Sequence, residues 1–380
     1  MKKERILFVV NVDWFFISHR LPIAIKAMSD GYEVHLACSN TGKLQKLAEL
    51  GINIHELSFS RSGNGLLNEL GTVTLLRKVI AKVQPNILHA VTIKPVIYSG
   101  IVLHSFMSKP KFVAAISGLG YVFSADNLRA KLTRLFVSVL YKFAFKHKNK
   151  IVIFQNKTDE SILSRVTRLK PIDKELIRGS GADLNVYKYQ TEPKAKSIKI
   201  AMACRLLKEK GVYEYVEAAK IVKSKFNNVE FILAGTPDLD NPNTVSQLEL
   251  EQWQASGVIS VIGHCDNIPQ LFSESHVVTM PSYYGEGVPK VLIEAAACGR
   301  PIVTTCNPGC RDAIIPEKTG ILVPVKDADS LADALIRLIE SKSLRHEMGS
   351  KAREYAIKEF NIDNVVQKHL DIYRALLTRQ

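Results

Sequence analysis

The sequence predicts an α/β protein made of two doubly wound domains, each with a parallel sheet covered by helices on both faces. Two series of short, β-rich apolar runs alternate with helical patterns along the 380 residues, and such alternation is typical of parallel sheets. A polar stretch containing Pro193 separates the two series. At this length two domains, each with its own hydrophobic core, are expected.

The first series fills the first half of the chain and indicates an N-terminal domain over residues 1–185. Residues 5–10 form the first strand-like run, and the segment 11–20 is expected to be a loop. A helical pattern over 21–29 ends at Asp30-Gly31, which is a turn signal. The other strand-like runs of this half are 33–37, 52–57, 87–91, 111–116 and 151–155.

The second series indicates a C-terminal domain over residues 186–361. Helical patterns over 212–226 and 286–298 lie between its strands. Gly179-Ser180-Gly181, followed by the polar segment 188–197, is expected to form a hinge before the first of them. A final amphipathic helix within 362–380 is expected to join the N-terminal domain. The strand-like runs are 198–203, 229–234, 258–263, 277–280, 301–304 and 320–323. Because ligands bind at the carboxyl ends of parallel strands, we expect the domains to face each other across a cleft.

The net charge of +14 is carried by the first half of the chain. Residues 1–185 contain 27 Lys and Arg against 13 Asp and Glu, whereas the remainder contains 24 of each. This asymmetry favours a polyanionic surface beside the N-terminal half, either a nucleic acid or an anionic membrane. A solvated basic face without a partner would explain the charge equally well.

One helical pattern, over residues 127–150, is basic and amphipathic and contains no acidic residue. Its large apolar residues are Leu128, Leu132, Leu135, Phe136, Leu140, Phe143 and Phe145. Its cations are Arg129, Lys131, Arg134, Lys142, Lys146, Lys148 and Lys150. Helices of this kind lie on anionic bilayers. A core helix with a basic outer face is the alternative.

No segment of the sequence is predicted to cross a membrane or to direct export. No run approaches the roughly 18 to 20 uncharged apolar residues of a spanning helix. The apolar run 6–10 is too short for a signal-peptide core. We therefore expect a cytoplasmic protein.

The segment 281–295 has the strongest chemical pattern in the chain. It follows a strand, passes through glycines and enters a helix, and it carries the carboxylates of Glu286 and Glu294. Both can face a ligand at the helix N-terminus, where free backbone N–H groups of Gly287 and Val288 could hold a phosphate. The alternative is a helix whose first carboxylate favours the dipole and whose second lies on the surface.

This segment resembles the E-x(7)-E motif of the family 4 retaining glycosyltransferases, which have the GT-B fold. The turn 203–211, A-C-R-L-L-K-E-K-G, resembles the G-R-x-x-x-x-K-G turn of that family, with Cys204 in place of the usual glycine. Residues 301–304 and 320–324 are similar to its later segments. The resemblance covers residues 198–360 and implies two Rossmann-like domains of the GT-B type.

The resemblance implies a role for each matching residue. Glu294 would hydrogen-bond the donor ribose, and Glu286 would contact the transferred sugar. Arg205 and Lys210 would hold the diphosphate, on which negative charge accumulates as it leaves. As surface residues at a helix start, these two cations would instead oppose the helix dipole. The other expected donor-binding residues are Gly287, Val288, Pro289 and Gly235.

The resemblance also implies the chemistry of the reaction. The acceptor would attack from the face that the leaving group leaves, and the leaving phosphate would help to take the acceptor proton. We recognise no Asp-x-Asp metal motif and therefore expect no metal ion or other cofactor, because side chains and the helix dipole would neutralise the leaving group.

Three segments of the N-terminal half, 14–20, 89–95 and 116–123, resemble a more specific branch. Its members build bacterial surface polysaccharides or lipid-linked oligosaccharides on undecaprenyl diphosphate, and some add an α-linked N-acetylhexosamine. The expected acceptor-binding residues are Ser18, His19, Arg20, Lys94, Ser117 and Gly118. His19 and Arg20 could instead cap a helix, and His89 could be a packing residue at a strand end.

The resemblance thus implies a hexosyltransferase that moves a sugar from a UDP-sugar to an undecaprenyl-diphosphate-linked saccharide, in O-antigen and lipopolysaccharide biosynthesis. It would work peripherally on the inner face of the plasma membrane. The alternatives are a nucleotide-sugar epimerase on the same fold and a basic nucleic-acid or membrane-binding protein without catalysis. A Rossmann oxidoreductase would need G-x-G-x-x-G after a first strand, and aromatic-basic RNA signatures are absent, so we expect no nucleic-acid partner.

Overall fold

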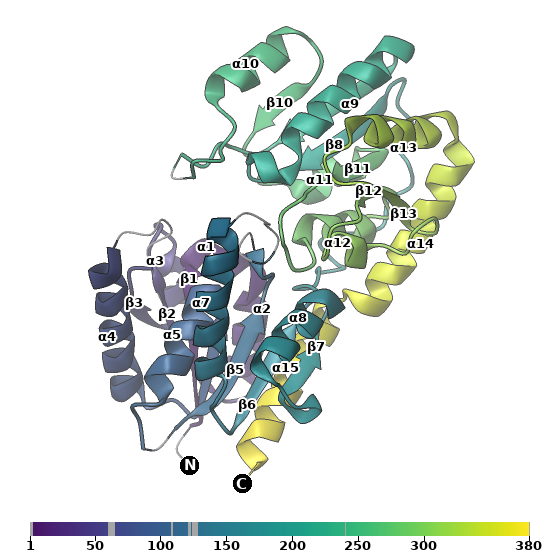
Figure 1. The fold of residues 1–380 in the computed structure, drawn as a ribbon. Helices are drawn as coiled ribbons and strands as arrows, with labels where there is room; N and C mark the ends of the chain where they lie inside the picture. Colours follow the sequence, from purple (N-terminus) through teal and green to yellow (C-terminus); the bar gives the residue numbers. More distant parts are fainter. Residues whose placement is uncertain are drawn as a thin grey trace. The chain divides into compact units, whose positions relative to one another are not determined.

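The computed structural model divides the chain into two compact units, each a parallel sheet with helices on its faces (Figure 1). Unit 1 comprises Met1–Ser180 and Ile362–Gln380, and unit 2 comprises Gly181–Asn361. The residues that the structure describes are 3–59, 65–107, 109–120, 123, 128–239 and 241–379, with the backbone alone for 65–67 and 129.

Unit 1 is built on a seven-stranded parallel sheet in the order β3-β2-β1-β4-β5-β6-β7. The strands are β1 (Arg5–Val12), β2 (Glu33–Ser39), β3 (Asn53–Glu56), β4 (Ile87–Val91), β5 (Lys111–Ile116), β6 (Lys150–Phe154) and β7 (Lys174–Leu176). The strand order reverses between β1 and β4, which makes their carboxyl ends the switch point of the sheet. The edge strand β7 was not predicted, because it is short and its sequence, K-E-L, lacks an apolar pattern.

Helices cover both faces of this sheet and form two separate hydrophobic cores. One face carries α1 (Asp13–His19), α2 (Leu21–Ser29), α3 (Leu44–Glu49) and α15 (Ile362–Thr378). The other face carries α4 (Gly65–Val83), α5 (Ile93–Leu103), α7 (Leu128–Ala144) and α8 (Lys157–Thr167). The last helix of the chain therefore belongs to the core of unit 1.

The segment 11–20, expected to be a loop, is the end of β1 followed by α1. Phe16 is fully buried in the core. Asp13, also buried, accepts hydrogen bonds from the backbone N–H groups of Thr41 at 2.7 Å and Lys43 at 2.9 Å. A helix of seven residues is not stable by itself. Its tertiary contacts, which the sequence pattern does not reveal, stabilise it.

Unit 2 is built on a six-stranded parallel sheet in the order β10-β9-β8-β11-β12-β13. The strands are β8 (Ile198–Ala203), β9 (Val229–Ala234), β10 (Ser260–Gly263), β11 (Val277–Met280), β12 (Ile302–Thr305) and β13 (Gly320–Val323). The helices are α9 (Val212–Lys225), α10 (Gln247–Ala255), α11 (Ile268–Ser273), α12 (Lys290–Ala297), α13 (Ala328–Glu340) and α14 (Lys342–Glu359). The order reverses between β8 and β11, so the loops after these two strands meet at the switch point.

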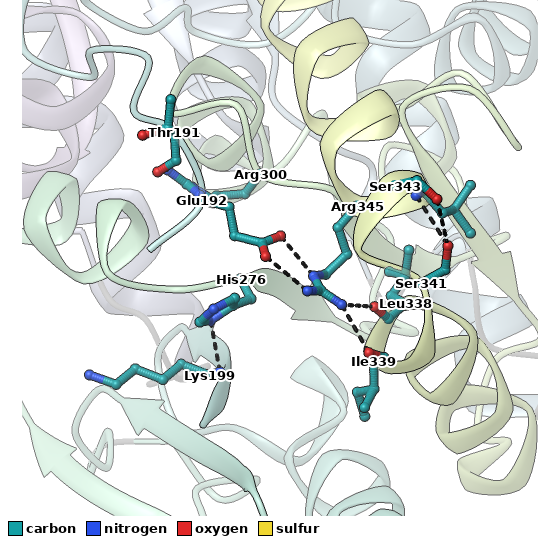
Figure 2. A network of polar contacts seen from close by, with 11 residues as sticks. Thr191, Glu192, Lys199, His276, Arg300, Leu338, Ile339, Ser341, Ser343 and Arg345 are labelled. Carbon is teal, nitrogen blue, oxygen red and sulfur yellow. Dashed lines mark hydrogen bonds and ion pairs between the residues drawn. The ribbon is translucent and has the colours of Figure 1, made fainter. Parts of the chain in front are cut away.

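The second part of the expected hinge, 188–197, is fixed to the rest of unit 2 by two buried arginines, and Figure 2 shows the contact that one of them, Arg345, makes with Glu192. Arg345 forms a bidentate ion pair with Glu192, with both N–O distances 2.8 Å. Arg300 donates hydrogen bonds to two backbone carbonyls of the same segment. We call residues 187–193 the strap. This attachment could not be predicted from the polar sequence of the segment, because both arginines come from distant positions in the chain.

Candidate active site

The predicted donor-binding residues lie on the loops that follow β8, β9 and β11 and on the helix α12. Arg205 and the 3-10 turn η2 (Lys208–Lys210) follow β8, and Gly235 follows β9. Glu286 lies on the loop between β11 and α12. This helix begins at Lys290 and not at residue 286 as predicted, because the preceding glycines and the extended backbone of Pro289 delay its start.

Lys210 and Glu286 form an ion pair between the loops after β8 and β11. Nζ of Lys210 lies 2.7 Å from Oε2 of Glu286, and the two side chains are only 13% and 14% exposed. The hydroxyl of Ser282 donates to the other oxygen, Oε1, at 2.7 Å. Gly211, at φ 81°, allows this close approach, since a Cβ there would lie 2.3 Å from the carbonyl oxygen of Pro281. Low exposure strengthens the pairing.

Arg205 and Asp238 connect the loop after β8 with the loop after β9. Nη1 of Arg205 lies 3.0 Å from Oδ2 of Asp238, and the arginine side chain is 49% exposed. Water therefore weakens this pair. Gly235, at φ 144°, brings the two loops together, because a Cβ there would lie 1.9 Å from the carbonyl oxygen of Cys204. Burial raises the pKa of the Cys204 thiol to about 12, so it stays protonated at neutral pH.

A cavity of about 500 Å³ opens beside the ends of β9 and β10. Its lining includes Gly235, which the sequence predicted as a donor-binding residue, and Gly263 at the end of β10. Leu250 and Glu251 contribute an apolar and an acidic side chain from α10. Its volume is typical of small-ligand sites.

Glu294 lies on α12 and is 7% exposed. The hydroxyl of Tyr187 donates to its Oε1 at 2.7 Å, and Nζ of Lys290 lies 3.6 Å from the same oxygen. Burial raises the pKa of Glu294, and the charge of Lys290 and the Tyr187 hydroxyl oppose this shift. In the described part of the chain, both side-chain partners of this carboxylate contact Oε1, which leaves Oε2 for a ligand.

The loop before α12 holds the remaining donor-binding predictions. Val288 is 5% exposed, and Pro289 is the N-cap of the helix. Gly287 contacts the loop after β12, since a Cβ at Gly309 would lie 1.8 Å from the Gly287 carbonyl oxygen. The loop before α12 and the loop after β12 are therefore in direct contact.

The residues predicted to bind the acceptor lie in unit 1. Arg20 is 2% exposed, and its Nη1 donates to the carbonyl of His19 at 2.8 Å. The geometry therefore favours a role for Arg20 in the fold over contact with an acceptor. The ring of His19 stacks on Phe15 with 4.1 Å between centroids. Ser18 precedes it on the same short helix.

The other acceptor-binding predictions follow neighbouring strands of the unit 1 sheet. Lys94, after β4, forms an ion pair with Glu69 at 2.6 Å. Ser117 and Gly118 follow β5, and the glycine has a φ of 100°. The Ser117 hydroxyl is buried and has no hydrogen-bond partner among the described residues. These positions share the carboxyl edge of the sheet with the end of β1.

Two site residues, Asp238 and Tyr187, were not predicted. Asp238 follows a strand in a polar loop, which is a usable signal. Tyr187 carried no signal, because its partner Glu294 lies 107 residues away.

Contrary to expectation, two Asp-x-Asp sequences occur, at 238–240 and 327–329. Asp238 pairs with Arg205. Asp327 caps α13 by accepting from the N–H of Ser330 at 2.8 Å, and Asp240 lies outside the described residues. Over those residues, no group of three or more His, Cys, Asp or Glu side chains is placed to hold a metal ion.

Both halves of the chain match known protein families. The family "Glycosyl transferases group 1" matches residues 186–355, and "Glycosyl transferase 4-like" matches residues 5–156. The chain belongs to the glycosyltransferases.

This glycosyltransferase is similar over nearly its whole length to two bacterial transferases. It is 28% identical, over 97% of the chain and 98% of the relative, to N,N'-diacetylbacillosaminyl-diphospho-undecaprenol alpha-1,3-N-acetylgalactosaminyltransferase of Campylobacter jejuni. It is 23% identical, over 91% of the chain and 89% of the relative, to UDP-Gal:alpha-D-GlcNAc-diphosphoundecaprenol alpha-1,3-galactosyltransferase of Escherichia coli.

Solved structures confirm the predicted GT-B fold of the glycosyltransferase. The Anabaena HepE structure in complex with UDP superposes with a TM-score of 0.78 at 18% identity, covering 98% of this chain and 100% of that one. The structure of WaaG, a glycosyltransferase involved in lipopolysaccharide biosynthesis, gives a TM-score of 0.76 at 15% identity, covering 97% and 99%.

Proposed function

We propose that this glycosyltransferase moves an N-acetylhexosamine from a UDP-sugar to a saccharide carried on undecaprenyl diphosphate, in the biosynthesis of a surface polysaccharide. The observation that carries the proposal is the arrangement of Arg205, Lys210 and Glu286 on adjoining loops of one sheet edge in unit 2. The names of both full-length relatives support the choice of substrates, since each is a transferase acting on a sugar linked to diphospho-undecaprenol.

In the proposed reaction, the bond between the sugar C1 and the diphosphate oxygen breaks as the acceptor hydroxyl attacks C1 from the same face. The bonding electrons go to the diphosphate, which takes the acceptor proton. Arg205 and Lys210 stabilise the charge that grows on the leaving group, and Glu286 contacts the transferred sugar. Because two fixed cations can supply this stabilisation, we propose that the enzyme needs no metal ion.

The proposed donor site contains charges that are paired already. A diphosphate must share Lys210 with Glu286 and Arg205 with Asp238, and the less exposed Lys210 pair is the harder to separate. Pairing keeps each cation in position before the donor binds, so little reorganisation is required during the reaction.

We further propose that α7 attaches unit 1 to an anionic membrane surface, on the inner face of the plasma membrane. Its exposed large apolar side chains, between 39% and 74% accessible, are Leu128, Leu132, Leu135, Phe136, Val139 and Phe143. Exposed lysines accompany them at positions 131, 142, 146 and 148. A bilayer of anionic lipids can bury the apolar stripe and attract the cations at once.

Two residues of the predicted membrane-binding helix, Lys150 and Phe145, are buried and therefore do not belong to its exposed face. Lys150 is 7% exposed and its Nζ lies 3.1 Å from Asp173, so it belongs to the interior and not to the membrane-facing set. Phe145 is also buried. Asn127 and the side chain of Arg129 lie outside the described residues. In the described part of the chain no helix has both the length and the hydropathy required to cross a bilayer.

A panel of nucleotide sugars assayed with undecaprenyl-diphosphate-linked acceptors tests the proposed reaction. We expect product from a UDP-N-acetylhexosamine and an α-linkage in its NMR spectrum. Interconversion of the nucleotide sugar without a glycosylated lipid would indicate an epimerase, and a β-linked product would refute the retaining mechanism.

A further inference from the structure

The strap is held against unit 2 along its length. Nη1 of Arg353, on α14, donates to the carbonyls of Tyr187 at 2.7 Å and Ala297 at 2.6 Å. Farther along, Arg300 binds two strap carbonyls and Arg345 binds the carboxylate of Glu192, as Figure 2 shows for the latter pair. Two guanidinium groups thus bind the backbone of the strap and a third binds its Glu192 side chain, in a segment that has no regular secondary structure.

This attachment places the Tyr187 hydroxyl at the carboxylate of Glu294. The hydroxyl donates to Oε1, because an ionised carboxylate can only accept, and the 2.7 Å distance is the shorter of the two contacts on that oxygen. Burial and the neighbouring negative charge raise the pKa of Tyr187, so the hydroxyl keeps its proton at neutral pH. The two oxygens of Glu294 are therefore inequivalent.

We propose that Tyr187 is a positioning residue of the donor site, which fixes one oxygen of Glu294 so that the other can accept hydrogen bonds from the ribose hydroxyls of the donor. The inference rests on the proposed role of Glu294 in donor binding. A carboxylate held at one oxygen loses less rotational freedom when the nucleotide binds, and preorganisation of this kind increases affinity.

The Tyr187 hydroxyl also favours the ionised form of Glu294, which is the form that accepts from ribose. Removing it should move the pKa of this already raised carboxyl further upward. The charged or titratable groups close to Glu294 are Lys290 on α12, Cys298 at the C-cap of this helix and Tyr187 on the strap. Arg353 and Arg300 lie beside Cys298. Without the hydroxyl, UDP affinity should therefore begin to fall at a higher pH.

The test measures UDP affinity by calorimetry for wild type, Tyr187→Phe, Glu294→Ala and the double variant, between pH 5.5 and 8. We expect Tyr187→Phe to weaken binding about tenfold at pH 7 and more at pH 6. In the Glu294→Ala background the same change should have no further effect. Tyr213→Phe is the matched control, because its hydroxyl donates to Glu249 at 2.8 Å, and it should bind UDP as wild type does.

The outcomes distinguish the role of Glu294 in donor binding from the positioning role of Tyr187. If Glu294→Ala binds UDP like wild type, the assignment of Glu294 to the donor site fails. If Glu294→Ala weakens binding but Tyr187→Phe leaves affinity and its pH profile unchanged, only the positioning role fails. A Tyr187→Phe effect of equal size in both backgrounds would show that the tyrosine acts through the fold and not through Glu294, which also overturns the inference.

Discussion

At the scale of single residues, the proposed donor site contains charges whose placement disfavours stability. Glu294 is a nearly fully buried carboxylate, and burial raises its pKa despite the nearby Lys290 and Tyr187. A residue kept ionised in such a place lowers the stability of the folded state relative to a neutral side chain of the same shape. Buried ionisable residues with a shifted pKa are typical of functional sites.

We therefore expect Glu294→Gln to stabilise the protein while weakening UDP binding. The folded pKa of Glu294 lies above its unfolded value, so the penalty for ionising it is absent below about pH 4 and fully present once the pH exceeds the folded pKa. The gain in unfolding free energy should therefore be larger at pH 8 than at pH 4.5, because the penalty applies only to the ionised carboxylate. Denaturant titrations at pH 4.5 and 8 measure it, and a variant less stable than wild type at pH 8 would contradict this reading.

The sequence indicated which residues belong to the proposed site better than it indicated which residues they contact. The glycine-flanked segment 281–295 and the turn 203–211 pointed to Glu286, Glu294, Arg205 and Lys210, and the structure pairs Lys210 with Glu286. The contacts of Tyr187 and the burial of Arg20 could not be predicted, because they depend on residues brought together only by the tertiary fold.

At the scale of secondary-structure elements, α15 closes the core of unit 1 around a buried polar group. His369 is 1% exposed and donates through Nδ1 to the carbonyl of Val365 at 2.7 Å. His89 on β4 lies 2.5 Å from the Tyr373 hydroxyl of the same helix. Burial, followed by the charge of Arg20, lowers the pKa of His369 to about 3.

This arrangement predicts that unit 1 loses stability as the medium becomes acidic. The pKa of His369 in the folded protein is below its value of about 6.5 in the unfolded chain. The stability that the neutral imidazole contributes is therefore fully present above pH 6.5 and is lost as the pH falls towards 3. Between pH 7 and 4.5 this one residue should account for about 2 kcal/mol. His369→Leu should lose correspondingly less stability over that range in urea titrations. Equal losses in the two proteins would show that another group causes the acid sensitivity.

The exposed face of α7 predicts salt-dependent binding to lipid. Coulombic attraction is screened over about 8 to 10 Å at moderate ionic strength, so co-sedimentation with anionic vesicles should decrease as salt rises. Replacing Lys131, Lys142, Lys146 and Lys148 by Gln should remove most binding, since each cation contributes about 1 kcal/mol.

The control for this experiment removes exposed lysines of unit 2 instead, at positions 220, 225 and 358. That variant should bind vesicles as wild type does, and both variants should glycosylate a short water-soluble acceptor. Equal binding to neutral and anionic vesicles, or full binding by the α7 variant, would show that this helix is a solvated face.

At the scale of the whole molecule, the alternation of apolar runs and helical patterns predicted both sheets. Strands such as β4 and β6 are buried along their full length, so their sequences are apolar apart from His89 and Lys150 and are easily recognised. The strap, α1 and β7 could not be predicted in this way. They are short or polar and owe their conformation to distant contacts.

The whole enzyme is predicted to work without a divalent cation, because Arg205 and Lys210 supply the charge that a metal ion would otherwise provide. Activity measured after dialysis against EDTA should equal that of the untreated enzyme. Loss of activity that Mg²⁺ restores would refute this prediction.

The most direct test of the proposed donor site is the turnover of the double variant Arg205→Ala/Lys210→Ala, measured beside its affinity for UDP. Negative charge on the leaving diphosphate grows in the transition state, so these cations should matter more for the rate than for ground-state binding. We expect kcat to fall by about 10² to 10³, while the Kd for UDP rises about tenfold or less. Wild-type turnover by the double variant would place the diphosphate elsewhere and contradict the account.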